Sequence, residues 1–326
     1  MDCTSHENKN KLKIVCGDIT FGVHGEDFSY IFSYQTGGLE SLVMKGKEWL
    51  YRTPRPTFWR ALTDNDRGNR FHLKSGMWMA ADMFLGCAGV RVLLDGREIP
   101  LPTAPENNTC TDEDYVGEAE IIFVYQTITV PSTKVEVSYK VEGTGRILVG
   151  VHYFGKEGLP ELPVFGMRFL MPTKATGYEY QGLSGETYPD RMAGGVPGVY
   201  RIDGLPVTRY LVPQDCNVHM ETKWLKIYRN TTLNNADKDT EQFGICIRAR
   251  EGESFAFSCI PYTAGELENA THQEELPVPR RTVLSVLGAV RGVGGIDSWG
   301  ADVEEKYHIS GEKDIEYSFY IESLQM

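Results

Sequence analysis

Apolar and polar residues alternate with a period of two along much of the chain. Residues 119–130, 134–141 and 146–153 each follow this pattern, and the turn-forming pairs Pro131-Ser132 and Glu142-Gly143 separate them. Because successive side chains of a strand point to opposite faces, each run predicts a strand with one buried face. The three runs together predict a β-meander.

Tight turns extend this strand pattern along the chain. Asp95-Gly96 lies between the strand-like runs 90–94 and 97–99, and Gly37-Gly38 occupies a similar place between two earlier runs. Such pairs adopt the positive φ angles that a two-residue hairpin turn requires. Short runs punctuated by turn signals continue to the C-terminus, so the sequence predicts an all-β fold, a large antiparallel β-sandwich.

Helical patterns are scarce. Residues 77–84 predict one short helix, and residues 264–270 predict a second, with Thr263 as its N-cap. Internal repeats and low-complexity linkers are absent from the sequence. We therefore interpret residues 12–326 as one domain that follows a polar N-terminal tail, residues 1–11.

Composition limits the function classes. The chain has 326 residues, and 41% of them are hydrophobic, which is enough for a sizeable core. Its net charge of −12 disfavours nucleic-acid and membrane partners. The sequence contains neither a secretion signal nor an apolar run of about 18 residues. Its seven cysteines are scattered and never spaced as Cys-x-x-Cys, as expected of reduced thiols. We therefore expect a cytoplasmic protein.

The residues themselves do not indicate a complete catalytic site. A retaining glycosidase needs two carboxylates about 5–5.5 Å apart. Glu274-Glu275 suit solvation better than paired catalysis, and for Glu186 and Asp190 the simpler interpretation is a turn-like segment clamped by Arg191. The sequence also lacks a nucleophile elbow and closely spaced metal ligands, so we expect no metal site in this chain.

Trp299 is the strongest single candidate for ligand contact. The face of an indole can stack on the C–H face of a sugar ring, and neighbouring glycines leave space beside it. Asp297 and Ser298 are placed to brace this loop, although a core tryptophan at a strand end is an equally simple interpretation. The other tryptophans lack glycine neighbours, and we expect core packing for Trp49, Trp59, Trp78 and Trp224.

Two distant segments together resemble a known family. Phe58-Trp59-Arg60-Ala61, followed by Asp64-Asn65-Asp66-Arg67-Gly68, is similar to the start of the C-terminal domain of glycoside hydrolase family 2 β-galactosidases, and Gly294-Gly295-Ile296-Asp297-Ser298-Trp299 is similar to a segment near its end. In bacteria with a split enzyme, this domain is a separate small chain. The likeness continues in order through residues 185–191, 213–215 and 262–272.

This resemblance implies an antiparallel supersandwich of the galactose mutarotase-like type. It also implies that the catalytic glutamates lie elsewhere, in a TIM barrel of about 250 residues for which this chain shows no pattern. The chain would then be the small subunit of a β-galactosidase. It would complete the active site of a large chain that hydrolyses terminal β-D-galactosyl residues, as in lactose, and would contain no catalytic residue.

The resemblance also implies which residues meet the substrate. The position of Trp299 projects into the shared active site and forms part of the sugar platform, with Asp297 and Ser298 beside it. The segment Gly68-Asn69-Arg70-Phe71 resembles a family loop near the mouth of that site. The family uses Mg²⁺, and often Na⁺, bound mainly by the large chain, so no cofactor is expected in this chain.

Two other function classes remain open from the sequence. Sugar mutarotases (aldose 1-epimerases) share the supersandwich and use a histidine acid with a glutamate base, for which His152, His219 and His272 are available. A non-catalytic carbohydrate-binding module would use Trp299 as its platform. Polarimetry of galactose anomers tests the first alternative, and direct binding of galactosides by the isolated chain tests the second.

The replacement Trp299→Ala distinguishes a sugar platform from a core residue. A platform role predicts nearly unchanged folding and a loss of substrate affinity on the order of 1–3 kcal/mol in the reconstituted enzyme. A core role predicts a stability cost of about 3–5 kcal/mol and an unchanged Michaelis constant. The unfolding midpoint and the galactoside kinetics of the same variant provide the test. A large drop in midpoint with unchanged affinity would contradict the platform role.

Overall fold

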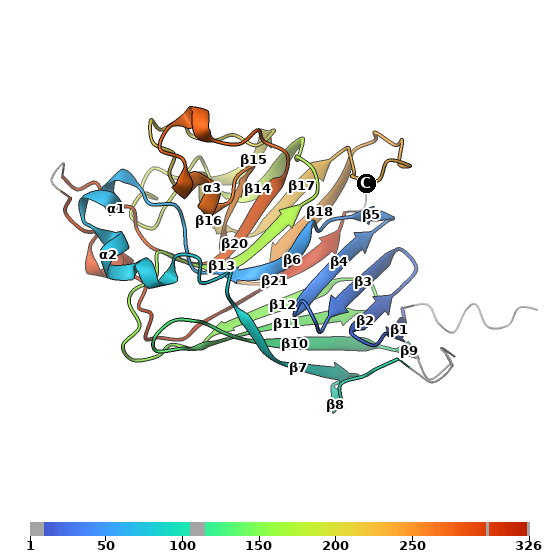
Figure 1. Cartoon of the computed structure of the whole chain (residues 1–326). Coiled ribbons are helices and arrows are strands. Elements are labelled where there is room, and N and C mark those ends of the chain that lie inside the picture. The colour runs from blue at the N-terminus through green and yellow to red at the C-terminus, as the bar shows by residue number, and fades with distance from the viewer. Residues whose placement is uncertain (1–9, 105–114, 298–299, 325–326) are drawn as a thin grey trace, which may run out of the picture.

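The computed structural model describes residues 10–104, 115–297 and 300–324, whose strands pair in three antiparallel sheets (Figure 1). The ten-stranded sheet contains, in spatial order, β15 (Pro197–Asp203), β14 (Gly177–Leu183), β17 (Trp224–Arg229), β18 (Phe243–Ala249), β21 (Ile315–Ser323), β12 (Ile147–Tyr153), β11 (Lys134–Glu142), β10 (Glu118–Gln126), β7 (Gly86–Leu94) and β8 (Arg97–Ile99). The six-stranded sheet contains β5 (Lys47–Glu48), β4 (Gly38–Met44), β3 (Phe28–Ser33), β2 (Thr20–His24), β1 (Leu12–Cys16) and β9 (Tyr115–Val116). The five-stranded sheet contains β16 (Val218–Thr222), β19 (Phe255–Ile260), β20 (Thr282–Val290), β13 (Val164–Met171) and β6 (Arg52–Thr57).

The predicted meander is present as β10, β11 and β12. Along all three strands, buried residues alternate with partly exposed ones, as the period-two pattern requires. The hairpin between β7 and β8 turns at Asp95 and Gly96, whose φ angles are 47° and 75°. Both angles are positive, as expected for the type I′ turn predicted from this pair.

The six-stranded and five-stranded sheets both pack on the ten-stranded sheet. Phe32 of β3 lies with its ring centroid 6.5 Å from that of Phe123 in β10, and Phe169 of β13 lies 6.2 Å from Phe319 in β21. These rings belong to one continuous apolar core that includes strands of all three sheets. Burial of this large apolar surface is the main force that stabilises the fold, and the predicted antiparallel sandwich is confirmed.

The five-stranded sheet is covered on both faces. Every residue of β19 is buried. Phe257 faces the main core, whereas Ala256 packs with Tyr188 and Val218 in a second cluster on the opposite face. Because successive side chains of a strand alternate, this outer face is the one covered by the loops that follow β6, β14 and β20.

Short helices cover part of this outer face, and one of the two helix predictions is correct. Within the described residues the α-helices are α1 (Asp64–Gly68), α2 (Phe71–Ser75) and α3 (Ala264–Asn269), and the 3₁₀ turns are η1 (Gly76–Trp78), η4 (Gln273–Glu275) and η5 (Glu305–Tyr307). The predicted α3 is confirmed with its N-cap, because the Thr263 side chain accepts a hydrogen bond from the backbone N–H of Glu266.

The helix predicted at residues 77–84 is wrong. Trp78 ends η1, and Ala80 has a φ of 60°, which interrupts any right-handed helix. The indole of Trp78 is fully buried and its Nε1 donates to the carbonyl oxygen of Pro160, so tertiary packing determines the course of this segment. The real helices α1 and α2 precede it and were not predicted.

Two further expectations need correction. The strand expected at residues 119–130 ends at Gln126, because the hydroxyls of Thr127, Thr129 and Ser132 accept or donate hydrogen bonds within a turn that replaces the ladder. Core packing holds for the other tryptophans except Trp224, which is only partly buried beneath the amine of Lys226. Residues 1–9 of the predicted tail lie outside the described residues.

His219 of β16 is buried among aromatic rings. Its ring stacks on Phe257 at 4.8 Å and contacts Tyr178 and Tyr180. Burial penalises the charged form and lowers the pKa of His219 to about 4, against a partial increase from a backbone hydrogen bond at Gly185. The folded protein therefore contains neutral His219 at neutral pH, where it lacks the proton that a catalytic acid must donate.

This buried histidine predicts a pH dependence of stability. Its unfolded pKa is about 6.5, so its contribution is present above that value and is lost as the pH falls through 6.5 toward the folded pKa of about 4. The loss amounts to roughly 3 kcal/mol by linkage. The variant His219→Gln should lack this loss, so the difference in urea unfolding free energy between the two proteins should change between pH 7 and pH 4. The same dependence of unfolding free energy on pH in both proteins would contradict this role of His219.

Candidate functional site

The Asp-Asn-Asp motif forms α1 at one end of the molecule (Figure 1). Thr63 is its N-cap: the Thr63 hydroxyl accepts from the backbone N–H of Asp66 at 3.1 Å, and the Asp66 carboxylate accepts from the backbone N–H of Thr63 at 2.9 Å. This reciprocal capping box makes so short a helix possible. The spacing of Thr63 and Asp66 is the sequence signal that could have predicted α1.

Asp66 also forms the centre of a buried ion network. Arg60 donates to its carboxylate at 2.6 Å, and the exposed fractions of the two side chains are only 3% and 1%. Arg291, which follows β20, lies 3.5 Å from the other Asp66 oxygen and is itself fully buried. One carboxylate therefore joins two cationic side chains that are far apart in the sequence, because charges removed from water must be paired.

Arg291 also forms ion pairs with two other carboxylates. Its guanidinium donates to Glu161 at 3.0 Å and to Asp302, and it lies 4.4 Å from the ring centre of Phe71 in α2. The Glu161 carboxylate in turn contacts the ring of His308 at 2.8 Å. The planar guanidinium presents several donors in fixed directions, so Arg291 fixes three chain segments at once. Sequence reasoning missed this residue, which carries no motif of its own.

The same network fixes the backbone of the glycine-rich segment that begins at Gly292. Arg60 donates to the carbonyl oxygen of Gly292 at 3.3 Å, and the Asn65 amide donates to that of Val293 at 2.9 Å. From the other side, the Asp190 carboxylate accepts from the backbone N–H of Val293 at 3.0 Å and of Gly294 at 2.8 Å. Consecutive peptide groups are therefore hydrogen-bonded to side chains from two separate loops.

Arg191 also takes part in this clamp, but not as the sequence suggested. Its guanidinium donates to the carbonyl oxygen of Gly294, whereas the sequence predicted a pair with Glu186 or Asp190. Glu186 instead accepts from the Thr208 hydroxyl and from the backbone N–H of Asn217, each at 2.9 Å. The partner of Arg191 is thus a backbone carbonyl group of the segment that starts at Gly292, and the expected carboxylate partner is replaced.

Two predicted site residues, Gly68 and Asn69, lie against residues 300–302. Gly68, at the end of α1, lies against Gly300 so closely that a Cβ on Gly300 would be 2.7 Å from the Gly68 carbonyl group. Gly300 also has a φ of 84°, a conformation that favours glycine. Next to this contact, the Asn69 amide donates to Asp302 at 3.2 Å. The two segments named by the family resemblance are therefore spatial neighbours.

The remaining predicted residues are placed as follows. Asp297 is exposed and its carboxylate accepts from the backbone N–H of Ala301 at 3.1 Å; its role in substrate binding stays a prediction. Arg70 is exposed and has a φ of 60°, at the junction of α1 and α2. Ser298 and Trp299 lie outside the described residues. Their roles stay predictions.

Two carboxyl groups beside the network have strongly shifted pKa values. Burial raises the pKa of Asp215 to about 6, although the charge of Arg60 and a hydrogen bond from Tyr188 partly oppose this. Burial also tends to raise the pKa of Asp302, but hydrogen bonds from Lys74 and Arg291 outweigh it and lower that pKa to about 2. Asp302 is thus a permanent anion that anchors the cationic groups around it.

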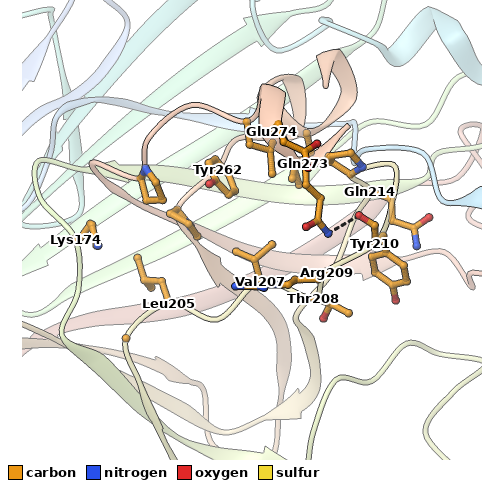
Figure 2. Close-up of a pocket in the computed structure, with 16 residues that line it drawn as sticks. Lys174, Leu205, Val207, Thr208, Arg209, Tyr210, Gln214, Tyr262, Gln273 and Glu274 are labelled. Carbon is orange, nitrogen blue, oxygen red and sulfur yellow. Dashed lines mark hydrogen bonds between the residues drawn. The ribbon is translucent and has the colours of Figure 1, made fainter. Parts of the chain in front are cut away.

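A cleft of about 580 Å³ is lined by residues of the segment 204–214 and by residues between 261 and 279 (Figure 2). Gln214, which lines it, accepts from the backbone N–H of Asp64 at 2.7 Å. Gln273 also lines it and donates to the carbonyl oxygen of Tyr210 at 2.6 Å (Figure 2). Both amides are thus engaged with backbone groups, and sequence reasoning gave no indication of this cleft.

The three histidines considered for a mutarotase occupy different environments. His152 pairs with Asp314 at 3.0 Å and His272 with Glu275 at 3.3 Å, both near the surface, whereas His219 is buried. The described part of the chain has no group of three or more His, Cys, Asp or Glu side chains arranged to bind a metal. No helix among the described residues is long and apolar enough to cross a membrane.

Comparison with known proteins places these features in a family. The family model described as beta galactosidase small chain matches residues 24–321. The β-galactosidase small subunit of Latilactobacillus sakei is 60% identical over 315 residues, which cover 96% of this chain and 99% of that protein. The β-galactosidase of Halalkalibacterium halodurans is 34% identical over 96% of this chain, and the chain spans only 28% of its length.

Among solved structures, a galactose mutarotase-like protein from Lactobacillus casei matches 94% of this chain and 100% of its own, with 9% identity and a TM-score of 0.40. The galactose 1-epimerase of Lactobacillus acidophilus matches 94% of this chain, with 9% identity and a TM-score of 0.37. The assignment of the fold rests on the strands and sheets of the chain itself.

The buried network predicts unequal effects for two aspartates of the same helix. Asp66→Asn leaves Arg60 and Arg291 without their shared counter-charge and should cost about 3–5 kcal/mol of unfolding free energy. Asp64→Asn is the matched control, because Asp64 forms only an exposed pair with Arg67, worth about 0.5 kcal/mol. Urea unfolding at neutral pH measures both. Equal costs would show that the network does not stabilise the fold.

Proposed function

The chain belongs to the family of β-galactosidase small chains, and on that basis we propose that it completes the active site of a separate large chain. That large chain would hydrolyse terminal β-D-galactosyl residues, as in lactose. In this proposal Trp299 forms the sugar platform, Asp297 and Ser298 brace its loop, and the segment Gly68-Asn69-Arg70 lies beside it. The main support is the set of side-chain hydrogen bonds to the backbone of residues 292–294, which fix the start of this loop.

The proposal assigns the catalytic carboxylates to the large chain. Around the glycine-rich segment, the carboxylates of Asp66, Asp190 and Asp302 are all engaged by arginines or by backbone N–H groups. Groups that are already hydrogen-bonded in this way are suited to positioning a loop, whereas a nucleophile and an acid must face the scissile bond. The sequence similarity to about a quarter of a longer β-galactosidase agrees with this division.

The cofactors and the compartment follow from the same proposal. We propose that Mg²⁺ and Na⁺ are bound by the large chain, since acidic side chains beside α1 already have arginine or lysine partners. A cytoplasmic location agrees with free thiols at Cys87, Cys216, Cys246 and Cys259. Removal of divalent ions by a chelator should therefore reduce activity of the complex and leave the unfolding midpoint of the isolated small chain unchanged.

The central prediction is that neither chain is fully active alone. The purified small chain should show negligible hydrolysis of a chromogenic galactoside, because it would contribute only one wall of the site. Addition of the large chain should restore activity in proportion to complex formed, with saturation at equal amounts of the two chains. Measured rates across a titration of one chain into the other test this.

Three results would contradict the proposal. The first is robust hydrolysis by the highly purified small chain that one replacement of its own acidic residues abolishes. The second is catalysed interconversion of galactose anomers by the small chain in a polarimeter, which would favour a mutarotase. Tight binding of galactosides by the isolated chain would favour a carbohydrate-binding module instead, since a half-site provides few of the polar contacts that a sugar needs.

A further inference from the structure

We propose that an exposed apolar surface formed by the segment from α2 to β7 is a docking site for the large chain. It consists of five side chains, which we call the methionine surface: Leu73, Met77, Met79, Met83 and Phe84. The inference rests on the proposed function, because it names the partner as the large chain of the same enzyme. It goes further by assigning the contact to residues outside the sugar-binding loop.

The exposure of the methionine surface is large. The exposed fractions are 71% for Leu73, 76% for Met83 and 60% for Phe84, with Met77 and Met79 at 40% and 43%. Clustered apolar side chains of this size on a soluble protein mark an interaction site, whereas single exposed ones need no explanation. Methionine and phenylalanine are both enriched at protein interfaces, and the flexible methionine side chain adapts to the partner.

The segment beneath this surface is firmly anchored. Phe71, Trp78 and Ala81 are fully buried, and Trp78 stacks on Phe58 with ring centroids 5.4 Å apart. The segment therefore alternates between side chains that enter the core and side chains that face the solvent. An ordered backbone that presents apolar groups outward loses little conformational entropy on association, as a preformed docking site should.

A groove continues this surface toward α3. Met79 and Met83 line it together with Trp59, Arg55 and Ala264, and its volume is about 920 Å³. Two partly buried residues that also line it, Arg168 and Asp82, form an ion pair in which Arg168 donates at 2.7 Å. The groove thus offers an apolar wall to an extended segment of a partner chain.

Continuity with the proposed active-site loop identifies the partner. Lys74, which lies next to Leu73, pairs with Asp302 at 3.0 Å, and Asp302 follows the loop that carries Trp299. In Figure 1, α1, α2 and the segment near residue 300 lie at the same end of the molecule. A large chain that covers the loop must pass beside the methionine surface, so the two contacts belong to one interface.

The division of the enzyme into two chains supplies a physical reason for this surface. In the longer relatives, of which this chain matches about a quarter, covalent linkage keeps the two parts together at high effective concentration. A separate chain has no such linkage, and its affinity must come from the contact area, typically about 800 Å² on each partner. Apolar side chains in the middle of that area provide most of the binding energy.

The test measures association of the small chain with the large chain purified from the same organism. The variants Met83→Glu and Phe84→Ser should each weaken binding by about tenfold or more, as for central interface residues. Their unfolding midpoints should not change, because both side chains are exposed. Leu233→Glu is the matched control, since Leu233 is also 60% exposed but lies on the loop between β17 and β18.

Enzyme kinetics of the same variants separate docking from catalysis. At saturating small chain, the variants should recover the kcat and the KM of the unmodified complex, because only the dissociation constant is altered. Unchanged affinity in both variants would overturn the proposal, as would a loss of self-association without any effect on the large chain. If the unmodified chains do not associate at all, the proposed function itself fails, which a titration without variants reveals first.

Discussion

The rest of the site depends on a single constraint: the guanidinium of Arg291 is fully removed from water and must be neutralised in place. Its partners Asp66, Glu161 and Asp302 come from three separate segments of the chain. Movement of any one of these segments would remove a counter-charge from the buried guanidinium. The network therefore specifies one arrangement of the loops on the outer face of the five-stranded sheet, and α1 is part of it.

The three sheets make this arrangement possible because they provide a rigid base. The ten-stranded sheet packs on both others through aromatic side chains such as Phe123 and Phe319, and β19 and β20 are buried over most of their length. Loops on such a base can be fixed by hydrogen bonds instead of by their own secondary structure. The Asp190 carboxylate and the Asn65 amide do so for the backbone of residues 293 and 294.

The proposed division of labour follows from the same chemistry. Arginine and carboxylate groups that fix a loop are fully engaged, so the small chain would contribute position and surface while the large chain contributes the reacting groups. Two parts of the chain would then meet the partner for different reasons. The loop that carries Trp299 would contact the sugar, and the methionine surface beside α2 would supply the affinity that a separate polypeptide needs.

The sequence by itself determined the class of fold and the family. Period-two runs such as 134–141 show which face of a strand is buried, and Asp95-Gly96 permits only a narrow range of turns. Local sequence was therefore sufficient to predict these strands and this turn. The motifs at residues 58–68 and 294–299 indicated the family, which the comparisons confirmed.

The sequence did not determine the course of residues 77–84 or the partners of Arg191 and Arg291. Burial of Trp78 against Phe58 overrode local helix propensity, and no local pattern reveals which carboxylate a buried arginine will meet. Only the tertiary structure decided these points, because they depend on contacts between segments that are distant in the sequence. Trp78 and the Pro160 carbonyl group are 82 residues apart, and Arg191 and the Gly294 carbonyl group are 103 apart.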